Sequence, residues 1–137
     1  MNPAAFDIAN HFTAWPANFH GSTPHLLDAS RYPTHDEMRT FLVAYLKNCM
    51  TLVDAPVDAP APVFSEPSPA LHERELVALE NAVRAWIPSS YGMWAIWGLV
   101  QAREDVLAHV AKPDFDYISY TRCRMAVFYR ELAALGV

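Results

Sequence analysis

The sequence predicts an all-α domain of about five helices. Apolar residues recur at spacings of three and four along several segments, and caps and prolines separate those segments. No internal repeat and no convincing pair of strands is visible. With 137 residues the chain is one domain by length. Its apolar fraction of 53% with 18% charged residues indicates a large core, or apolar surface that another structure covers.

The first helix is expected over residues 4–15, where the apolar side chains fall near one broad face until Pro16 stops the helix. Residues 16–33 have the prolines, glycine and asparagine of a loop. The second helix has a defined start, because Thr34 and Glu37 form the pattern of a capping box. Its core face extends to about residue 50 and comprises Met38, Phe41, Leu42, Tyr45, Leu46 and Cys49.

The segment 54–69 is rich in proline, which fixes φ and removes backbone donors, so it is expected to be a stiff, exposed connector. A third helix is expected over 70–86, and Pro88 ends or kinks it. The two serines that follow can cap a fourth helix, which continues through Val106.

Asp114 or Asp116 can cap the final helix, expected over 115–135. Its predicted core face comprises Ile118, Met125, Phe128, Tyr129 and Leu132.

Composition and charge exclude several classes of function. The net charge of −5 comes with no basic stripe, which argues against nucleic acid. Cys49 and Cys123 lie far apart in helical patterns and favour a reducing, cytoplasmic setting. The N-terminus does not resemble a signal peptide, and the longest apolar run, 91–100, has about half of the roughly 20 residues that span a bilayer.

The usual signatures of a complete active site are not visible. The sequence has no glycine-rich phosphate loop and no serine nucleophile elbow. Its six histidines do not have the spacing of metal ligands. We therefore assign no catalytic residue and no metal ligand to this chain.

Trp94 and Trp97 stand out in the apolar run that ends at Gln101. Residues three apart share one helix face, so both indoles point the same way. They can fill a helical core, or they can form two walls of a cage for a cation. The residues alone leave both interpretations open.

Five blocks in order resemble the choline and ethanolamine kinases, with the fungal choline kinases most similar. Residues 6–12 read FDIANHF and resemble the family's F-D-I-(G/A)-N-H-(F/L) motif. Residues 31–34 (RYPT) resemble the opening of the next helix, and residues 94–103 (WAIWGLVQAR) resemble the W-x-(L/I)-W helix. Residues 115–120 (FDYISY) resemble the F-(D/G)-(Y/F)-x-x-Y motif, followed by an arginine and an aromatic residue at 124 and 128.

The resemblance implies the helical C-terminal part of a protein-kinase-like large lobe, over residues 1–137. Complete members phosphorylate choline or ethanolamine with ATP and Mg²⁺, in the synthesis of phosphatidylcholine or phosphatidylethanolamine. In the family, the ATP-binding lobe, the H-N-D-x-x-x-x-N loop and the I-D-(F/Y)-E motif precede the block at 6–12. We therefore expect the chain to hold most of an acceptor pocket, to lack the catalytic machinery and to be inactive alone. The missing lobe or another chain is an expected partner.

By the resemblance, four residues are candidates for a choline cage: Trp94, Trp97, Tyr120 and Phe19. A quaternary ammonium cannot donate an N–H hydrogen bond, so aromatic faces and carboxylates are the groups that can hold it. Further residues that could line the pocket are Tyr117, Phe115 and Trp15. Motif residues with an expected structural role are Asp7, Asn10, His11 and Gln101.

One position departs from the family pattern. Ala14 stands where choline kinases usually have a glutamate, which weakens the electrostatic half of cation recognition.

The aromatic residues favour choline over ethanolamine. Three alternatives stay open: an ethanolamine kinase fragment, a non-catalytic choline-binding or interaction module, and an ordinary helical bundle.

Overall fold

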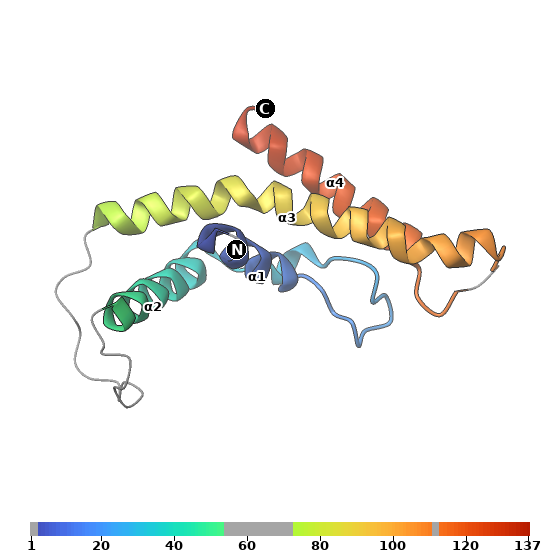
Figure 1. Cartoon of the computed structure of the whole chain (residues 1–137), viewed down its shortest axis with the longest axis horizontal. Helices are drawn as coiled ribbons and strands as arrows, with labels where there is room; N and C mark the ends of the chain where they lie inside the picture. The colour runs from blue at the N-terminus through green and yellow to red at the C-terminus, as the bar shows by residue number, and fades with distance from the viewer. Residues whose placement is uncertain (1–2, 54–72, 111–112) are drawn as a thin grey trace. The chain divides into compact units, whose positions relative to one another are not determined.

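The computed structural model describes residues 3–53, 73–110 and 113–137, and in these ranges the all-α prediction is confirmed (Figure 1). A single antiparallel bridge joins Ala17 to Leu27, and the described residues form no strand. The Pro-rich segment 54–69 lies outside the described residues. None of the described helices is long and apolar enough to cross a membrane. The elements are α1 (Ala4–Ala14), the 3₁₀ helix η1 (Ala29–Arg31), α2 (His35–Val53), α3 (Glu73–Leu107) and α4 (Tyr117–Leu135).

The expected end of a helix at Pro88 is wrong, because α3 is one helix of 35 residues with this proline inside it; the alternative, a kink at Pro88, stays a prediction. The two helices predicted on either side are therefore one. A proline inside a helix costs about 3 kcal/mol because it removes one backbone hydrogen bond and crowds the preceding turn. Pro88 is among the most completely buried side chains, and Ile87 and Ser90 beside it are buried as well. Burial against the neighbouring elements stabilises the helix at Pro88. This burial offsets the local cost of the proline, from which the sequence predicted a helix end.

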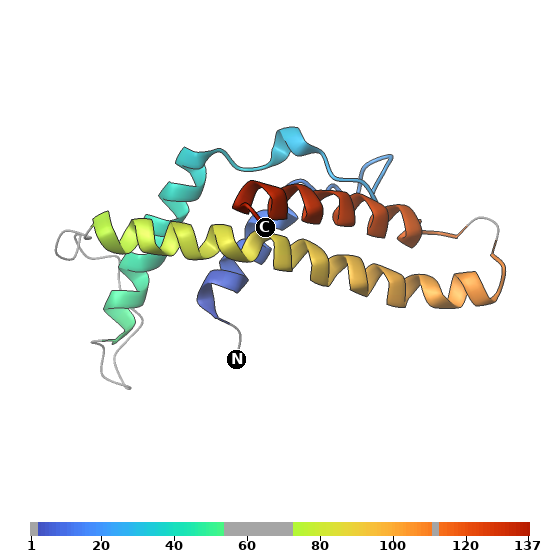
Figure 2. The ribbon, with the colours of Figure 1, turned by 90° about the horizontal axis from the view of Figure 1, so that it is seen from above.

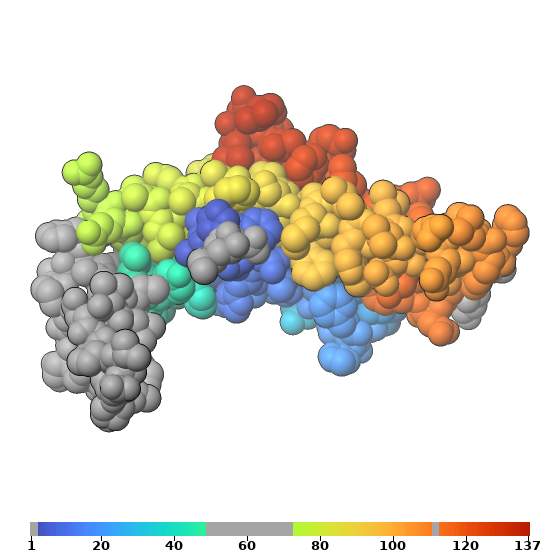
Figure 3. Space-filling view, viewed as in Figure 1, coloured from blue at the N-terminus to red at the C-terminus, as the bar shows by residue number. Residues whose placement is uncertain are grey.

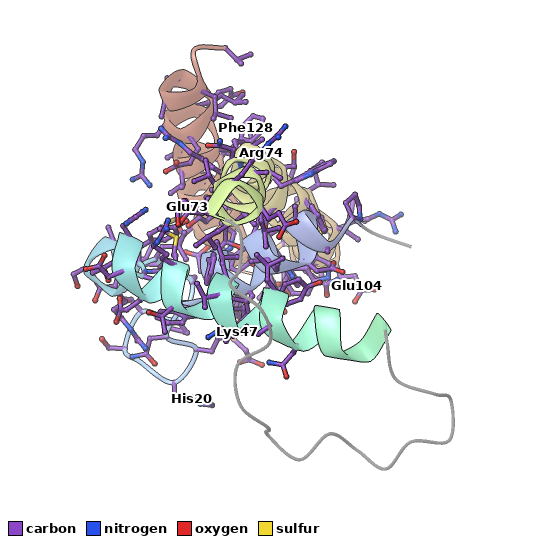
Figure 4. All side chains as sticks on the ribbon, turned by 90° about the vertical axis from the view of Figure 1, so that its left-hand side faces the viewer. His20, Lys47, Glu73, Arg74, Glu104 and Phe128 are labelled. Carbon is purple, nitrogen blue, oxygen red and sulfur yellow. The ribbon has the colours of Figure 1, made fainter. Side chains whose placement is uncertain are left out.

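The chain forms two compact units, and the larger comprises Met1–Pro33 and Val83–Val137. In it, α4 runs antiparallel beside the C-terminal half of α3, as Figures 1 and 2 both show. Gly98 faces Thr121, and Gly92 faces the ring of Phe128, which is labelled in Figure 4. The described core of this unit comprises Ala5, Ile8, Ala9, Phe12, Val83, Ile87, Tyr91, Ala95, Ala102 and Tyr120.

The smaller unit, Thr34–Ala82, joins α2 to the first turns of α3. The predicted capping box is confirmed: the Thr34 backbone N–H donates to Glu37 at 2.8 Å, and the Glu37 N–H donates to the Thr34 hydroxyl at 3.3 Å. Among its described residues, Leu42 and Leu76 are the buried apolar side chains. Arg39 donates to Glu80 at 3.0 Å and to Glu73 at 2.6 Å.

The buried face of α4 differs from the predicted one. Tyr129 is 63% exposed, whereas Tyr120, Thr121 and Arg124 are buried. The spacing of apolar residues could not identify this face, because two of its three buried residues are polar.

Asp116 is the residue that caps α4, since its carboxylate accepts the Ser119 backbone N–H at 2.8 Å. Hydrogen bonds from Ser119 hold the pKa of Asp116 below its ordinary value of 3.8. A carboxylate with a lowered pKa in the folded state stabilises the fold above its unfolded pKa. That stabilisation is lost as the pH falls through the folded pKa.

Replacing Asp116 with alanine is therefore expected to lower the free energy of unfolding by about 1 kcal/mol at neutral pH. Urea denaturation across a pH series checks this, and the difference from the wild type should shrink below about pH 4. Asp114→Ala is the matched control, because Asp114 is exposed and does not cap the helix. Equal effects of the two substitutions would contradict the assignment.

The C-terminal half of α3 leaves a row of apolar side chains uncovered, and Figure 3 shows part of its surface in yellow to orange. Ile96 is 66% exposed and Val100 is 61% exposed. Met93, Leu99, Val106 and Leu107 are exposed beside them. An apolar face of this extent on a described helix is typical of a surface that another structure covers.

Candidate functional site

Asn10 of α1 connects the first sequence block to the tryptophan helix. Its side-chain oxygen accepts the indole N–H of Trp94 at 2.6 Å and the hydroxyl of Ser90 at 3.0 Å. Ser90 and Trp94 are four residues apart, so both lie on the face of α3 that meets α1. The amide oxygen therefore fixes the orientation of one indole.

Thr13 extends this network by one turn of α1. Its hydroxyl lies 3.0 Å from the Asn10 carbonyl and 2.8 Å from the hydroxyl of Ser90. Each hydroxyl has only one hydrogen to donate. If Thr13 donates to the carbonyl and Ser90 to the Asn10 side chain, no hydrogen remains for the bond between the hydroxyls. The network thus has alternative arrangements that keep the buried oxygens in contact with donors.

The predicted cage tryptophans pack against each other. The rings of Trp94 and Trp97 are 5.5 Å apart and nearly perpendicular, at 80°. Trp97 also meets Tyr117 at 5.7 Å and Tyr120 at 5.8 Å, edge to face. Phe115 lies 4.7 Å from Tyr117 and 5.7 Å from Tyr120. Edge-to-face contacts at these distances are direct ring packing, so the two indoles do not form an open slot between them.

A small cavity of about 140 Å³ lies beside this cluster, between α1, α3 and α4. Three of the four predicted cage residues line it: Phe19, Trp94 and Tyr120. Trp97 is not among the lining residues, and its ring contacts those of Trp94 and Tyr120. The complete lining comprises Asn10, Thr13, Ala14, Ala17, Phe19, Tyr91, Trp94, Tyr120 and Arg124.

Exposure differs widely among the predicted aromatic residues. Phe19 is 56% exposed and Trp97 is 39% exposed, whereas only 3% of Tyr120 is exposed. A ligand in the cavity would therefore meet Phe19 at the rim and Tyr120 at the base. Burial raises the pKa of Tyr120 and that of the neighbouring Tyr91, so both phenols are neutral at physiological pH.

Arg124 also belongs to the cavity lining, although the aromatic pattern of the sequence does not predict it. It is 4% exposed, and its guanidinium carbon lies 3.3 Å from the centroid of the Tyr120 ring. One of its nitrogens donates to the His25 carbonyl at 3.3 Å. Burial lowers the pKa of Arg124 from its usual range. The signal in the sequence was the spacing Tyr120–Arg124, which places both on one face of α4.

The remaining predicted residues lie outside the cavity. The Trp15 indole N–H donates to Nε2 of His11 at 3.3 Å, which requires that nitrogen to be unprotonated. Asp7, His11 and Gln101 are exposed. His20 lies at the tip of the loop after α1 and points away from the helices (Figure 4).

A larger hollow of about 430 Å³ lies where α3 ends and α4 begins, and only Tyr117 of the predicted aromatic residues lines it. Its lining also includes Asp105 and Asp116. Within the described ranges, no three His, Cys, Asp or Glu side chains come together as a metal site. The described donor set therefore does not fit Mg²⁺.

The chain is similar in sequence to a known family of kinases over most of its length. A model of the choline/ethanolamine kinase family matches residues 1–129. "Probable choline kinase 1" of Arabidopsis thaliana is 30% identical over 129 residues, which cover 94% of this chain and 30% of that protein. The choline kinase of Schizosaccharomyces pombe is 30% identical over 166 residues, covering 99% of this chain and 36% of that protein. A probable ethanolamine kinase of Nematostella vectensis is 31% identical over 128 residues, covering 93% and 30%. The chain thus spans about a third of the length of these relatives.

Proposed function

Because this chain belongs to the choline/ethanolamine kinase family, we propose that it forms the part of such a kinase that binds the alcohol acceptor. The observation that carries the proposal is the aromatic-lined cavity, which contains Phe19, Trp94 and Tyr120. Trp94 and Tyr120 come from two separate blocks of the sequence, and Phe19 comes from the loop between the first two blocks. Aromatic faces attract a quaternary ammonium through the ring quadrupole, by up to about 2 kcal/mol for a desolvated face.

We propose choline as the preferred acceptor over ethanolamine. An ethanolamine ammonium brings three N–H donors, and each needs an acceptor when it is buried. The Asn10 side-chain oxygen already accepts two hydrogen bonds, and no carboxylate is among the described lining residues. A trimethylammonium group has no such donors and is satisfied by ring faces.

Phosphoryl transfer requires a catalytic base, Mg²⁺ and contacts to the phosphates. We propose that another part of the kinase supplies them, because this sequence carries neither the H-N-D-x-x-x-x-N loop nor the I-D-(F/Y)-E motif. The row of exposed apolar side chains on α3 supports this proposal, because such a row suits a surface against which the missing part of the kinase packs. We infer that the chain alone does not phosphorylate choline, and its place in phospholipid synthesis and in the cytoplasm stays a prediction.

A chimera tests this function. Residues 1–137 would replace the matching third of the Schizosaccharomyces pombe choline kinase, and phosphorylation of choline by ATP would be measured for the chimera and for the chain alone. The chimera is expected to be active and the chain inactive. In the chimera, Phe19→Ala is expected to raise the KM for choline about tenfold, by removal of one ring face, with a smaller change in kcat.

The matched control is Tyr129→Ala, since Tyr129 is an aromatic residue of similar exposure that lies outside the cavity. It should leave the KM unchanged. Either of two results would contradict the proposal: turnover of choline by the chain alone, or equal effects of the two substitutions on the KM for choline. A folded but inactive chimera that also fails to bind choline would favour a helical module without an acceptor pocket.

A further inference from the structure

The chain between α1 and η1 forms a closed loop, residues 17–27, which we name the rim loop because it carries Phe19 to the rim of the cavity (Figure 1). Ala17 and Leu27 form the antiparallel bridge at its neck. Within the loop, a first turn closed by a backbone hydrogen bond of 3.0 Å contains Phe19, and a second turn closed at 3.0 Å contains His25. The place where the second turn attaches to the rest of the protein therefore affects where the Phe19 ring lies.

Arg124 of α4 joins the rim loop to the base of the cavity. One of its nitrogens donates to the His25 carbonyl at 3.3 Å. Its guanidinium carbon lies 3.3 Å from the centroid of the Tyr120 ring, and the group also hydrogen-bonds to the Tyr120 side chain. Only 4% of Arg124 is exposed. A planar guanidinium can stack on a ring and donate to a carbonyl at its edge, so one buried side chain serves both partners.

The side chain of His25 makes a second attachment of the same turn. Its ring meets Phe115 edge to face, at 6.3 Å and 90°. Phe115 in turn lies 5.7 Å from the Tyr120 ring. The backbone and the side chain of His25 thus both connect the rim loop to the aromatic cluster at the start of α4.

We propose that Arg124 is a positioning residue of the acceptor pocket, which holds the rim loop against α4 and so places the Phe19 ring beside the ammonium of the acceptor. The identity of the ligand rests on the proposed function, whereas the attachment of the loop rests on the contacts of Arg124. A pocket whose rim is in place for only a fraction of the time binds its ligand more weakly by that fraction. Arg124 therefore lowers the KM for choline by acting through Phe19.

The charge of Arg124 by itself would act in the opposite direction, because a cation beside an ammonium site repels the ligand. Removal of the charge would then lower the KM for choline, whereas loss of the attachment raises it. In the chimera, Arg124→Met is expected to raise this KM about fivefold with a smaller change in kcat. Arg124→Lys keeps the charge but lacks the planar fork, so it should resemble Arg124→Met. Arg122→Met, at an exposed position of α4, is the control and should leave the KM unchanged.

Coupling to Phe19 is the measurement that a merely structural role would not affect. In the Phe19→Ala background, Arg124→Met is expected to change the KM for choline by less than about twofold, because the ring that it positions is already absent. Effects of the two substitutions that multiply would overturn the positioning role. A fall of the KM in Arg124→Met would overturn it as well.

Because Arg124→Met can destabilise the fold, the loop itself provides further tests. His25→Ala removes only the ring contact with Phe115 and is expected to raise the KM about twofold, again only while Phe19 is present. In the 137-residue chain, the Leu26 N–H donates to the Thr23 carbonyl at 3.0 Å and reports on the second turn. Its hydrogen exchange, measured by NMR, should be about fivefold faster in Arg124→Met, with no such change for the amides of α1. Equal acceleration in the loop and in α1 would contradict the attachment.

The outcomes separate the positioning role from the proposed function. If Phe19→Ala raises the KM for choline and Arg124→Met does not, the positioning role is refuted while the acceptor pocket stands. If the folded chimera neither binds nor phosphorylates choline, and Arg124→Met accelerates exchange in the rim loop alone, the proposed function fails while the attachment of the loop stands.

Discussion

Replacing Asn10 with alanine is expected to lower the free energy of unfolding by about 2–3 kcal/mol. The substitution removes the acceptor for the indole N–H of Trp94 and for the hydroxyl of Ser90. Ser90 can still bond to Thr13, 2.8 Å away, whereas the indole N–H loses its one hydrogen-bond partner among the described residues. Most of the loss therefore comes from Trp94. Urea denaturation followed by circular dichroism measures it.

A double-mutant cycle isolates the hydrogen bond. Trp94→Phe removes the donor and keeps an aromatic ring, so Asn10→Ala should cost less in that background, with a coupling of about 1 kcal/mol. Asn81→Ala, at an exposed position of α3, is the control and should change stability by less than about 0.5 kcal/mol. A coupling near zero would show that Asn10 does not hold the indole.

Replacing Gly98 with alanine is expected to destabilise the larger unit even though alanine is the better helix former by about 1 kcal/mol. A Cβ atom at this position would lie 2.5 Å from the Thr121 hydroxyl oxygen and 2.7 Å from a carbon of the Tyr120 ring. Those groups belong to the close crossing of α3 and α4, where the Thr121 hydroxyl also bonds to the Ala95 carbonyl at 3.2 Å. Overpacking costs typically about 1–3 kcal/mol, so after the gain in helix propensity we expect a net loss of up to about 2 kcal/mol.

The same helix supplies the matched control, since Gly92 also faces α4. A Cβ atom there would approach the Phe128 ring to 3.3 Å, a contact that a small shift of the ring relieves. Gly92→Ala should therefore be neutral or stabilising by up to about 1 kcal/mol. Thermal unfolding of both variants measures the difference, and equal behaviour would contradict the close crossing at Gly98. Gly98→Ala should also weaken ligand binding, because it displaces the cavity wall at Tyr120.

Local patterns predicted much of the fold because they reflect local physics. The capping box at Thr34, the stop after α1 and a carboxylate cap for α4 each depend on groups within three or four residues. The helix end expected at Pro88 also rests on a local rule. That prediction failed because the tertiary burial of Pro88 outweighed the missing backbone hydrogen bond.

Some features of the site could be predicted from the sequence, and others depend on the tertiary structure. The ordered blocks in the sequence predicted which aromatic residues belong together, and Phe19, Trp94 and Tyr120 do line one cavity. The contact of Trp97 with Tyr120 depends on how α3 and α4 cross. Arg124 lies over the Tyr120 ring from the next turn of the same helix, but its burial depends on the elements packed against α4. Ring orientation is set by contacts between residues more than 20 positions apart, which periodicity does not record.

The sequence by itself therefore determined the helical class, most of the helix ends and the family of this protein. Only the tertiary structure decided that one helix continues through Pro88, that the two indoles pack edge to face, and that a buried arginine belongs to the cavity lining. The physical reason is the range of the interactions. Caps and helix periodicity act within one turn, whereas the burial of a charge depends on every element packed around it.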